Sequence, residues 1–385
     1  MPPIRVNRRR FLGCSAAAGL ALSHGRVGEG AASGAPVRLG FIGLGTRGTG
    51  LLRTLLELPE AAVVVAVCDA EPRHRDRASG IVAKAKGARP DAMERIERLL
   101  ERPDVEAVVV ALPCDLHADV YGAAIRAGKH LYAEKPLALT LAECDMVIAE
   151  ATRAPELAVH VGFQRRSHPR YQEGVALLRE GELGSPVAAS AAWVSSNGPM
   201  NGHDDWLSRR ARSGDWMVEQ AVHIWDVFHW LAGGPPAYAF GQGRRDVFAD
   251  RQPGRDVTDH YAVQLGWADG FQATFLHSWV APADDRFTGN TQRVIGTAGG
   301  IDLGSGTVTF RDKERPRRTL YPGNQADTRL ALVAFLDAVR SGGSTPPPLT
   351  LAEARDATRT GLLVRQAVDE CRVVTLEEMG RPLSA

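Results

Sequence analysis

A glycine-rich turn between two apolar runs constrains the fold of this chain more than any other feature. Val37–Ile42 is a short apolar run, Gly43-Leu-Gly-Thr-Arg-Gly48 follows it directly, and residues 49–58 have the pattern of a helix that ends before a proline. A second apolar run, 61–68, stops at Asp69, about 20 positions beyond the glycines. Strand, glycine turn, helix, strand and acidic residue occur in this order in mononucleotide-binding βαβ units.

Each residue of the turn has a physical role in such a unit. Gly43 would make the tight turn, Gly45 would leave room for a pyrophosphate, and Gly48 would let helix and strand approach closely. The helix N-terminus would face the phosphates. Asp69 would accept hydrogen bonds from a ribose 2'-hydroxyl, so the motif predicts NAD and disfavours the 2'-phosphate of NADP.

Two alternatives remain open at this motif. Glycine is common in the chain, with 40 of 385 residues, and a glycine turn between a strand and a helix needs no ligand. In addition, Arg47 and Arg73 lie near the turn in sequence, and their positive charges keep NADP as the second choice of cofactor.

The first 35 residues have the layout of an export signal. Arginines without any acidic residue come first, a weakly apolar segment spans 11–22, and small residues follow over 28–35. Arg8 and Arg9, with Phe11-Leu12 behind them, resemble the twin-arginine motif, which directs folded proteins out of the cytoplasm. We therefore expect a periplasmic or extracytoplasmic protein without a permanent membrane anchor, because the apolar segment is too short to span a bilayer. The alternative is a disordered basic tail.

Composition excludes some classes of function. The 46 basic and 45 acidic residues nearly balance, so nothing indicates a surface for nucleic acid. Five cysteines show no C-x-x-C or other metal-binding spacing, and we predict no metal. A metal site made of Glu219, His223 and one of His203, Asp204 or Asp205 is the weaker alternative, because no H-E-x-x-H spacing supports it.

The pattern of elements predicts two domains after the signal. Strands and helices alternate over 36–160, which indicates a doubly wound parallel sheet of the Rossmann type. Over 161–385 we expect an α+β domain with a mostly antiparallel open sheet, because two apolar runs flank Ala268-Asp-Gly270, a hairpin signal. Thr350-Leu-Ala-Glu353 is a capping box that begins one of the C-terminal helices, which we expect to pack back on the fold.

Several short motifs, in this order and spacing, resemble one family. They are the glycine turn, the strand that ends in Ala-Leu-Pro113 with His117 four residues on, and Glu134-Lys-Pro136 after the next strand. Together they resemble the Gfo/Idh/MocA family of nicotinamide-dependent sugar and cyclitol oxidoreductases. The likeness continues through Gly162–Arg166 and Glu219–Asp226, where that family keeps its substrate residues.

The glycine turn, the sheet edge and the resemblance together define the expected cofactor site. Its members are Gly43, Gly45, Thr46, Arg47, Gly48, Asp69, Leu112, His117, Glu134 and Lys135.

Glu219, His223 and Asp226 are spaced at i, i+4 and i+7, so on one continuous helix they would share a face. A carboxylate one turn from an imidazole can fix its tautomer and raise its basicity, as a proton acceptor requires. An ordinary surface helix with a Glu and His pair has the same spacing and remains the alternative.

The resemblance implies a catalytic lysine at Lys135 and a catalytic histidine at His223. The family's usual residue four positions before the histidine is Asp, and this chain has Glu219, whose longer arm makes the orientation less certain. The resemblance also places Gln164, Arg165 and Asp226 in the substrate pocket. It further implies a homo-oligomer formed through the open sheet.

Export restricts the net reaction, because free NAD is not expected outside the cytoplasm. We therefore expect a tightly held NAD that is reduced and reoxidised within one site. A sugar-to-sugar oxidoreductase, an epimerase, and a glycosidase that oxidises transiently and then eliminates would each satisfy this expectation. A non-catalytic sugar-binding protein on the same fold is the competing class, although a binder needs neither Lys135 nor His223.

Overall fold

The structure is a computed structural model that describes residues 35–58, 61–200, 202–321 and 327–380. The predicted twin-arginine motif lies outside these residues. None of the helices in the described ranges is both long enough and apolar enough to cross a membrane.

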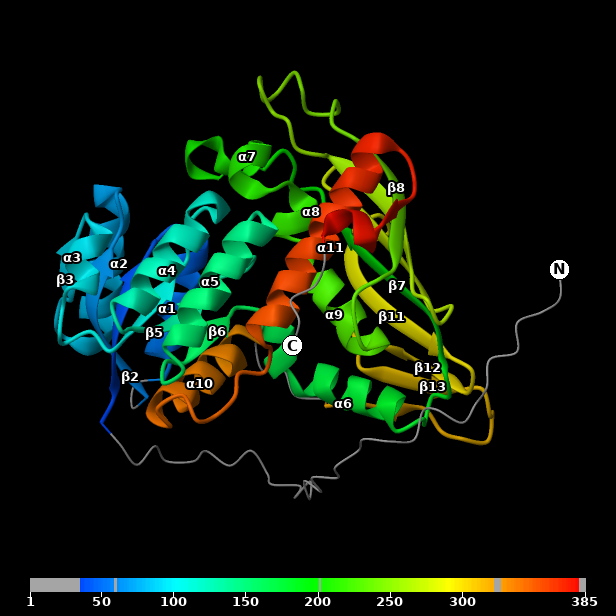
Figure 1. The fold of residues 1–385 in the computed structure, drawn as a ribbon, viewed down its shortest axis with the longest axis horizontal. Helices are drawn as coiled ribbons and strands as arrows, with labels where there is room; N and C mark the ends of the chain where they lie inside the picture. Colours follow the sequence, from blue (N-terminus) through cyan, green and yellow to red (C-terminus); the bar gives the residue numbers. More distant parts are fainter. Residues whose placement is uncertain (1–34, 59–60, 201, 322–326, 381–385) are drawn as a thin grey trace. The chain divides into compact units, whose positions relative to one another are not determined.

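A six-stranded parallel sheet forms the first half of the described chain, in blue and cyan in Figure 1. Its strand order is β3-β2-β1-β4-β5-β6, and every neighbouring pair is parallel. This is the doubly wound order, which confirms the predicted Rossmann fold. The elements are β1 (Val37–Ile42), α1 (Thr46–Leu56), β2 (Ala62–Cys68), α2 (Pro72–Lys86), β3 (Asp91–Met93), α3 (Ile96–Leu100), β4 (Ala107–Val110), η1 (Cys114–Leu116), α4 (His117–Arg126), β5 (His130–Ala133), α5 (Leu141–Arg153) and β6 (Val159–Val161).

The strand order reverses between β1 and β4, and both strands are almost entirely buried. Ligands of doubly wound sheets bind at the carboxyl ends of the strands where the order reverses. The glycine turn follows β1, and Glu134 and Lys135 follow β5. All of these residues therefore meet at one edge of the sheet.

A nine-stranded sheet forms the second half, and it is mostly antiparallel, as predicted. Its order is β14-β13-β12-β11-β7-β10-β9-β8-β15, and β9 pairs with β10 across the predicted hairpin. The pair of β7 and β10 is parallel. The strands are β7 (Pro186–Val194), β8 (Tyr238–Arg244), β9 (His260–Gly266), β10 (Gln272–Ser278), β11 (Gly289–Gly296), β12 (Gly299–Asp302), β13 (Thr307–Phe310), β14 (Arg318–Thr319) and β15 (Val374–Thr375).

Helices lie between the two sheets, with α9 and α11 facing the large sheet (Figure 1). The helix α11 contacts α5 of the first half and also α8, α9 and β8 of the second. It begins at the predicted capping box, where Thr350 accepts a hydrogen bond from the Glu353 amide. The elements are η2 (Gln164–Ser167), α6 (Pro169–Arg179), η3 (His203–Ser208), α7 (Arg210–Ser213), α8 (Trp216–Glu219), α9 (Val222–Ala232), α10 (Asp327–Arg340), α11 (Leu351–Glu370) and η4 (Leu376–Met379).

The helix α10 completes the core of the first half, although it comes late in the chain. Its buried residues Leu332 and Phe335 belong to the same apolar cluster as Phe41 of β1 and Leu52 of α1. The Phe335 ring also packs edge-on against Tyr132 of β5, with the ring centroids 5.7 Å apart. Residues from both ends of the described chain therefore build the layer on one face of the parallel sheet.

Candidate active site

The turn after β1 can be built only with glycine at two positions. Gly43 has φ +84°, and a Cβ atom there would lie 2.2 Å from the Ala111 carbonyl oxygen. A Cβ atom at Gly48 would lie 2.0 Å from the Gly43 carbonyl oxygen. Neither distance is possible for real atoms, so a side chain at either position would push α1 away from the sheet.

Gly45 has a different environment, because a Cβ atom built there meets no atom within 4 Å. Gly45 is the N-cap of α1, which begins at Thr46, and it leaves open space in front of the helix N-terminus. The first amides of a helix point outward and carry a partial positive charge, which suits an anionic group. These residues therefore fit the pyrophosphate of a dinucleotide.

Asp69 follows β2 and lies against the glycine turn. One carboxylate oxygen accepts a hydrogen bond from the Leu44 amide at 2.6 Å, and the other accepts one from the Glu71 amide at 2.9 Å. His74 Nδ1 lies 3.3 Å from the first of these oxygens. A carboxylate can accept about four hydrogen bonds, so Asp69 keeps capacity for a ribose hydroxyl.

Glu134 follows β5 at the carboxyl edge of the sheet and is almost fully buried. One carboxylate oxygen is 2.6 Å from Nε of Arg47, which ties the end of β5 to the glycine turn. The ring nitrogens of His117 lie 2.7 Å from the Pro136 carbonyl oxygen and 3.0 Å from that of Leu112. His117 thus fixes the two loops that border the site, and both of its polar atoms are engaged with the backbone.

Lys135 contacts the second half of the chain. Its Nζ donates hydrogen bonds to the backbone oxygen and to a carboxylate oxygen of Glu219, both at 2.7 Å. Burial alone would lower the pKa of Lys135, but the carboxylates of Glu219 and Glu134 outweigh it and leave the pKa raised. The lysine is therefore held as a cation at the sheet edge.

The predicted continuous helix from Glu219 to Asp226 is wrong. The helix α8 ends at Glu219, and α9 begins at Val222. In an unbroken helix the Glu219 carbonyl would accept the His223 amide. Lys135 takes that carbonyl instead, and the His223 amide bonds to the Gln220 carbonyl at 3.3 Å. The break turns Glu219 toward Lys135 and removes the predicted i, i+4 pairing with the imidazole.

His223 is buried beside the lysine, and the ring of Phe163 packs edge-on against it. Burial lowers the pKa of His223 well below its ordinary value, and the charges of Lys135, Arg165 and Arg47 lower it further. A neutral imidazole results, which has a free lone pair for a proton. This environment lowers the basicity of His223, whereas the sequence predicted that a neighbouring carboxylate would raise it.

The three residues predicted for the substrate pocket have different environments. Arg165 is buried, and its guanidinium lies over the ring of Trp193 at 5.7 Å from the centroid. Gln164 precedes it in η2. Asp226 is 1% exposed, and its carboxylate accepts hydrogen bonds from Arg166 at 2.7 and 3.0 Å. The Asp226 carboxylate is thus committed to holding α9 against η2.

Sequence reasoning gave no role to two buried charged residues near this site, Arg166 and Asp215. Arg166 binds Asp226, a buried acid far away in the sequence, which no local pattern reveals. Asp215 was also missed, although an aspartate directly before a short helix is an N-cap pattern. In the described part of the chain, no three His, Cys, Asp or Glu side chains lie close enough together to hold a metal.

A Rossmann sheet whose carboxyl edge carries a phosphate cradle, a lysine cation and a neutral histidine defines a nicotinamide-dependent oxidoreductase. Residues 37–163 match the family model described as "Oxidoreductase family, NAD-binding Rossmann fold", and 171–302 match the Gfo/Idh/MocA C-terminal domain. The chain belongs to the Gfo/Idh/MocA family.

Known relatives extend the comparison. The chain is 28% identical over 356 residues to myo-inositol 2-dehydrogenase of Thermotoga maritima, which covers 89% of this chain and 99% of that protein. It is 35% identical over 197 residues to inositol 2-dehydrogenase of Acidothermus cellulolyticus, which is 51% of this chain and 53% of that one. The crystal structure of a probable dehydrogenase from Thermotoga maritima superimposes with a TM-score of 0.71, at 25% identity and over 89% and 100% of the two chains.

We expect the stability of the protein to fall as the pH drops below about 6.5. The pKa of His223 is lowered in the folded state, and burial also lowers the pKa of His160 to about 4 and that of His229 to about 3. At a pH between the folded-state and the ordinary pKa of a histidine, the unfolded chain binds more protons than the folded protein. Each such histidine therefore lowers the free energy of unfolding by up to about 1.4 kcal/mol for each pH unit of acidification.

Urea unfolding at several pH values measures this slope. In His223→Asn the free energy of unfolding should depend less steeply on pH, because one of the titrating histidines is gone. Phe163→Leu is the matched control, since it loosens the same site without removing a titrating group, and it should lower stability at every pH while keeping the slope. An equal slope in wild type and His223→Asn would contradict the prediction.

Proposed function

We propose that this protein is an exported NAD-dependent oxidoreductase that acts on a hydroxyl group of a sugar, glycoside or cyclitol. The observation that carries the proposal is the meeting of Lys135, Glu219 and His223 at the sheet edge beside the glycine turn. The two relatives described above are both inositol 2-dehydrogenases, which favours a cyclitol or a sugar of similar size.

His223 acts as the base in this proposal, and Lys135 stabilises charge. The neutral His223 ring accepts the proton of the substrate hydroxyl. The Lys135 ammonium stabilises the negative charge that develops on the same oxygen, which makes the proton easier to remove. Glu219 holds the ammonium in place through two contacts. When bound, NAD supplies the carbon that accepts hydride, and the hydroxyl becomes a carbonyl.

The cofactor is proposed to be NAD. Asp69 presents a carboxylate where the adenosine ribose is expected, and a 2'-phosphate would be repelled there. The basic side chains nearby already have partners: Arg75 donates a hydrogen bond to the Asp69 carbonyl oxygen at 2.5 Å, and Arg77 to that of Leu44 at 2.6 Å. Both contacts hold the guanidinium groups against backbone oxygens, where they are less available to bind a phosphate.

Removal of either reacting group should reduce turnover without loss of the cofactor. We expect His223→Ala to lower the rate by about 10²–10⁴-fold and Lys135→Ala by about 10²–10³-fold. NAD binding, followed by quenching of protein fluorescence, should stay within a few fold of wild type. The assay follows the reduction of enzyme-bound NAD by its absorbance in a single turnover with each member of a panel of cyclitols and sugars.

Lys129→Met is the matched control for the lysine variant. Lys129 precedes the same strand β5 at its other end, where Nζ donates hydrogen bonds to the carbonyl oxygens of Arg102 and Val105. Its loss should lower stability and leave turnover per folded molecule unchanged. Full turnover in both Lys135→Ala and His223→Ala would refute the catalytic assignment.

We further propose that NAD stays bound and is regenerated in the site, because free NAD is not expected outside the cytoplasm, where the exported protein would act. We expect the mature protein, expressed without residues 1–35, to release about one NAD per chain on heat denaturation, identified by mass. Product should then form without reduced NAD accumulating in solution. Stoichiometric accumulation of reduced NAD would instead indicate an ordinary dehydrogenase, and an empty protein that cannot bind added NAD would indicate a sugar-binding protein.

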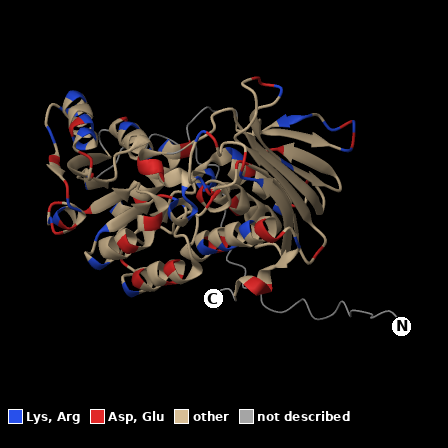
Figure 2. Ribbon diagram, turned by 90° about the horizontal axis from the view of Figure 1, so that it is seen from above, with Lys and Arg blue, Asp and Glu red and all other residues tan. Residues whose placement is uncertain are grey.

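We also propose that the protein forms a homo-oligomer through the outer face of its large sheet. The strands of the large sheet are mostly tan in Figure 2, so few of their residues are charged. Phe240, Leu276 and Ile295 are exposed on this face, and Ile295 is 55% exposed. An apolar face of this kind is costly to leave in water and is typical of an interface.

Leu276→Arg should therefore convert the oligomer to a monomer, measured by sedimentation velocity. Phe287→Arg is the matched control, because Phe287 is 58% exposed but lies in the loop between β10 and β11. It should leave the assembly unchanged. A wild-type protein that is monomeric at micromolar concentration would contradict the proposal.

A further inference from the structure

We propose that Asp215 is a positioning residue for Lys135: its buried carboxylate fixes the start of α8, so that the end of α8 presents Glu219 to the lysine ammonium. The inference rests on the proposed function only in giving Lys135 a catalytic role. The geometry that links Asp215 to Lys135 stands independently of the reaction.

The backbone of Asp215 is strained. Its φ is +72° and its ψ is 165°, a combination that is essentially restricted to glycine. In a residue other than glycine, such a conformation persists only where several independent contacts hold it. It occurs preferentially at functional sites. The position therefore requires this side chain strongly enough to outweigh the backbone cost.

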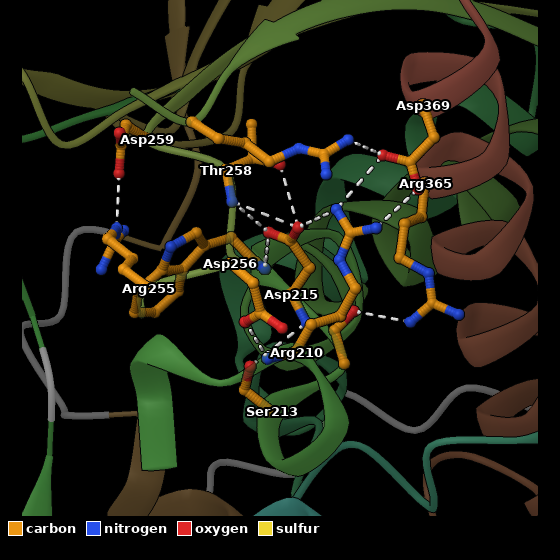
Figure 3. Close-up of polar contacts among 12 residues, drawn as sticks. Arg210, Ser213, Asp215, Arg255, Asp256, Thr258, Asp259, Arg365 and Asp369 are labelled. Carbon is orange, nitrogen blue, oxygen red and sulfur yellow. Dashed lines mark hydrogen bonds and ion pairs between the residues drawn. The ribbon is translucent and has the colours of Figure 1, made fainter. Parts of the chain in front are cut away.

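The carboxylate of Asp215 is fully buried and receives hydrogen bonds from three segments of the chain (Figure 3). One oxygen accepts the Trp216 amide at 2.7 Å and the Thr258 amide at 3.1 Å. The other accepts the Thr258 hydroxyl at 2.9 Å and Nη2 of Arg210 at 2.8 Å. The first contact caps α8, while the others anchor the cap to α7 and to the segment before β9.

The anchor extends to α11. Arg210 also pairs with Asp369 of α11 at 2.6 Å, and Arg365 of the same helix donates a hydrogen bond to the Gly214 carbonyl oxygen at 3.1 Å. Figure 3 shows these residues converging on Asp215 from different elements. The residue before α8 is thus tied to the helix that packs against both halves of the fold.

The helix α8 is one turn long, and a single turn is not stable without external contacts. The Asp215 carbonyl accepts the amides of Val218 at 3.0 Å and Glu219 at 2.8 Å, which closes the turn. Glu219 is its last residue and holds Lys135 with both its carbonyl and its carboxylate. Release of the Asp215 cap should therefore displace both oxygens that hold the lysine.

The titration of Lys135 is the readout, because a residue that merely stabilises the fold would leave it unchanged. The chain has only five lysines, Lys84, Lys86, Lys129, Lys135 and Lys313, so each can be followed by peptide mass spectrometry. Competitive acetylation with acetic anhydride over a range of pH gives the reactivity and the apparent pKa of each one. The other four lysines serve as internal references.

Asp215→Gly is the principal variant, since glycine adopts this backbone conformation freely and only the carboxylate is lost. We expect Lys135 to be acetylated about tenfold faster at mildly alkaline pH, as a pKa lower by about one unit gives. Glu219→Gln, which removes the carboxylate partner directly, sets the reference effect. The double variant should exceed Glu219→Gln by much less than the factor of Asp215→Gly alone, because only the backbone contact of Glu219 is left to displace.

Asp369→Asn is the matched control. Asp369 shares the partner Arg210 with Asp215 but does not contact α8, and the pair of Arg210 and Asp215 remains in this variant, so the Lys135 titration should change far less than in Asp215→Gly. If Asp215→Gly does not fold, Thr258→Val replaces it, since this variant removes one hydrogen bond to the carboxylate and nearly preserves shape. Thr258→Val should also raise the acetylation rate of Lys135, but by a smaller factor than Asp215→Gly.

Two results would overturn the inference. One is a folded Asp215→Gly or Thr258→Val protein with the wild-type Lys135 titration. The other is a double variant in which the effects of Asp215→Gly and Glu219→Gln multiply in full, because Asp215 would then not act through Glu219. Neither result depends on turnover or on NAD, so failure of the proposed function is recognised separately in the NAD reduction assay.

Discussion

The contact between the Lys135 ammonium and Glu219 determines most of what is distinctive in this structure. It joins the edge of the parallel sheet to the helical layer of the second half. It engages the Glu219 carbonyl at the break between α8 and α9, where the His223 amide bonds to the Gln220 carbonyl instead. It also keeps a positive charge beside His223, which contributes to the neutral state of that imidazole.

Buried aspartates paired with arginines hold the second half together around this contact. Arg166 binds Asp226 of α9, Arg210 binds Asp215, and Arg255 binds Asp259 with both side chains fully buried. Such pairs add little net stability over an apolar core, but removal of one partner leaves a charge without compensation. They fix which segments are neighbours, and in this chain two of the three lie within a few residues of Glu219 or His223.

The parallel sheet was predictable from the sequence because its signals are local. The strand from Val37 to Ile42 has the predicted bounds. The break after Glu219 was not predictable, since the Glu219 carbonyl bonds there to a side chain 84 positions away in the chain. The strand β8 was also missed, because its alternation of Phe240 and Gln242 with glycine is weak.

The place of α10 in the core has a consequence for the order in which the molecule can be made. The layer on one face of the parallel sheet contains Leu332 and Phe335, so the nucleotide half stays incomplete until the ribosome has passed residue 340. Domains that are contiguous in sequence can close during synthesis. Here the glycine turn is translated among the first residues of the fold, yet its supporting layer is complete only after α10 has been made, so the dinucleotide site matures well after its own strands and helices.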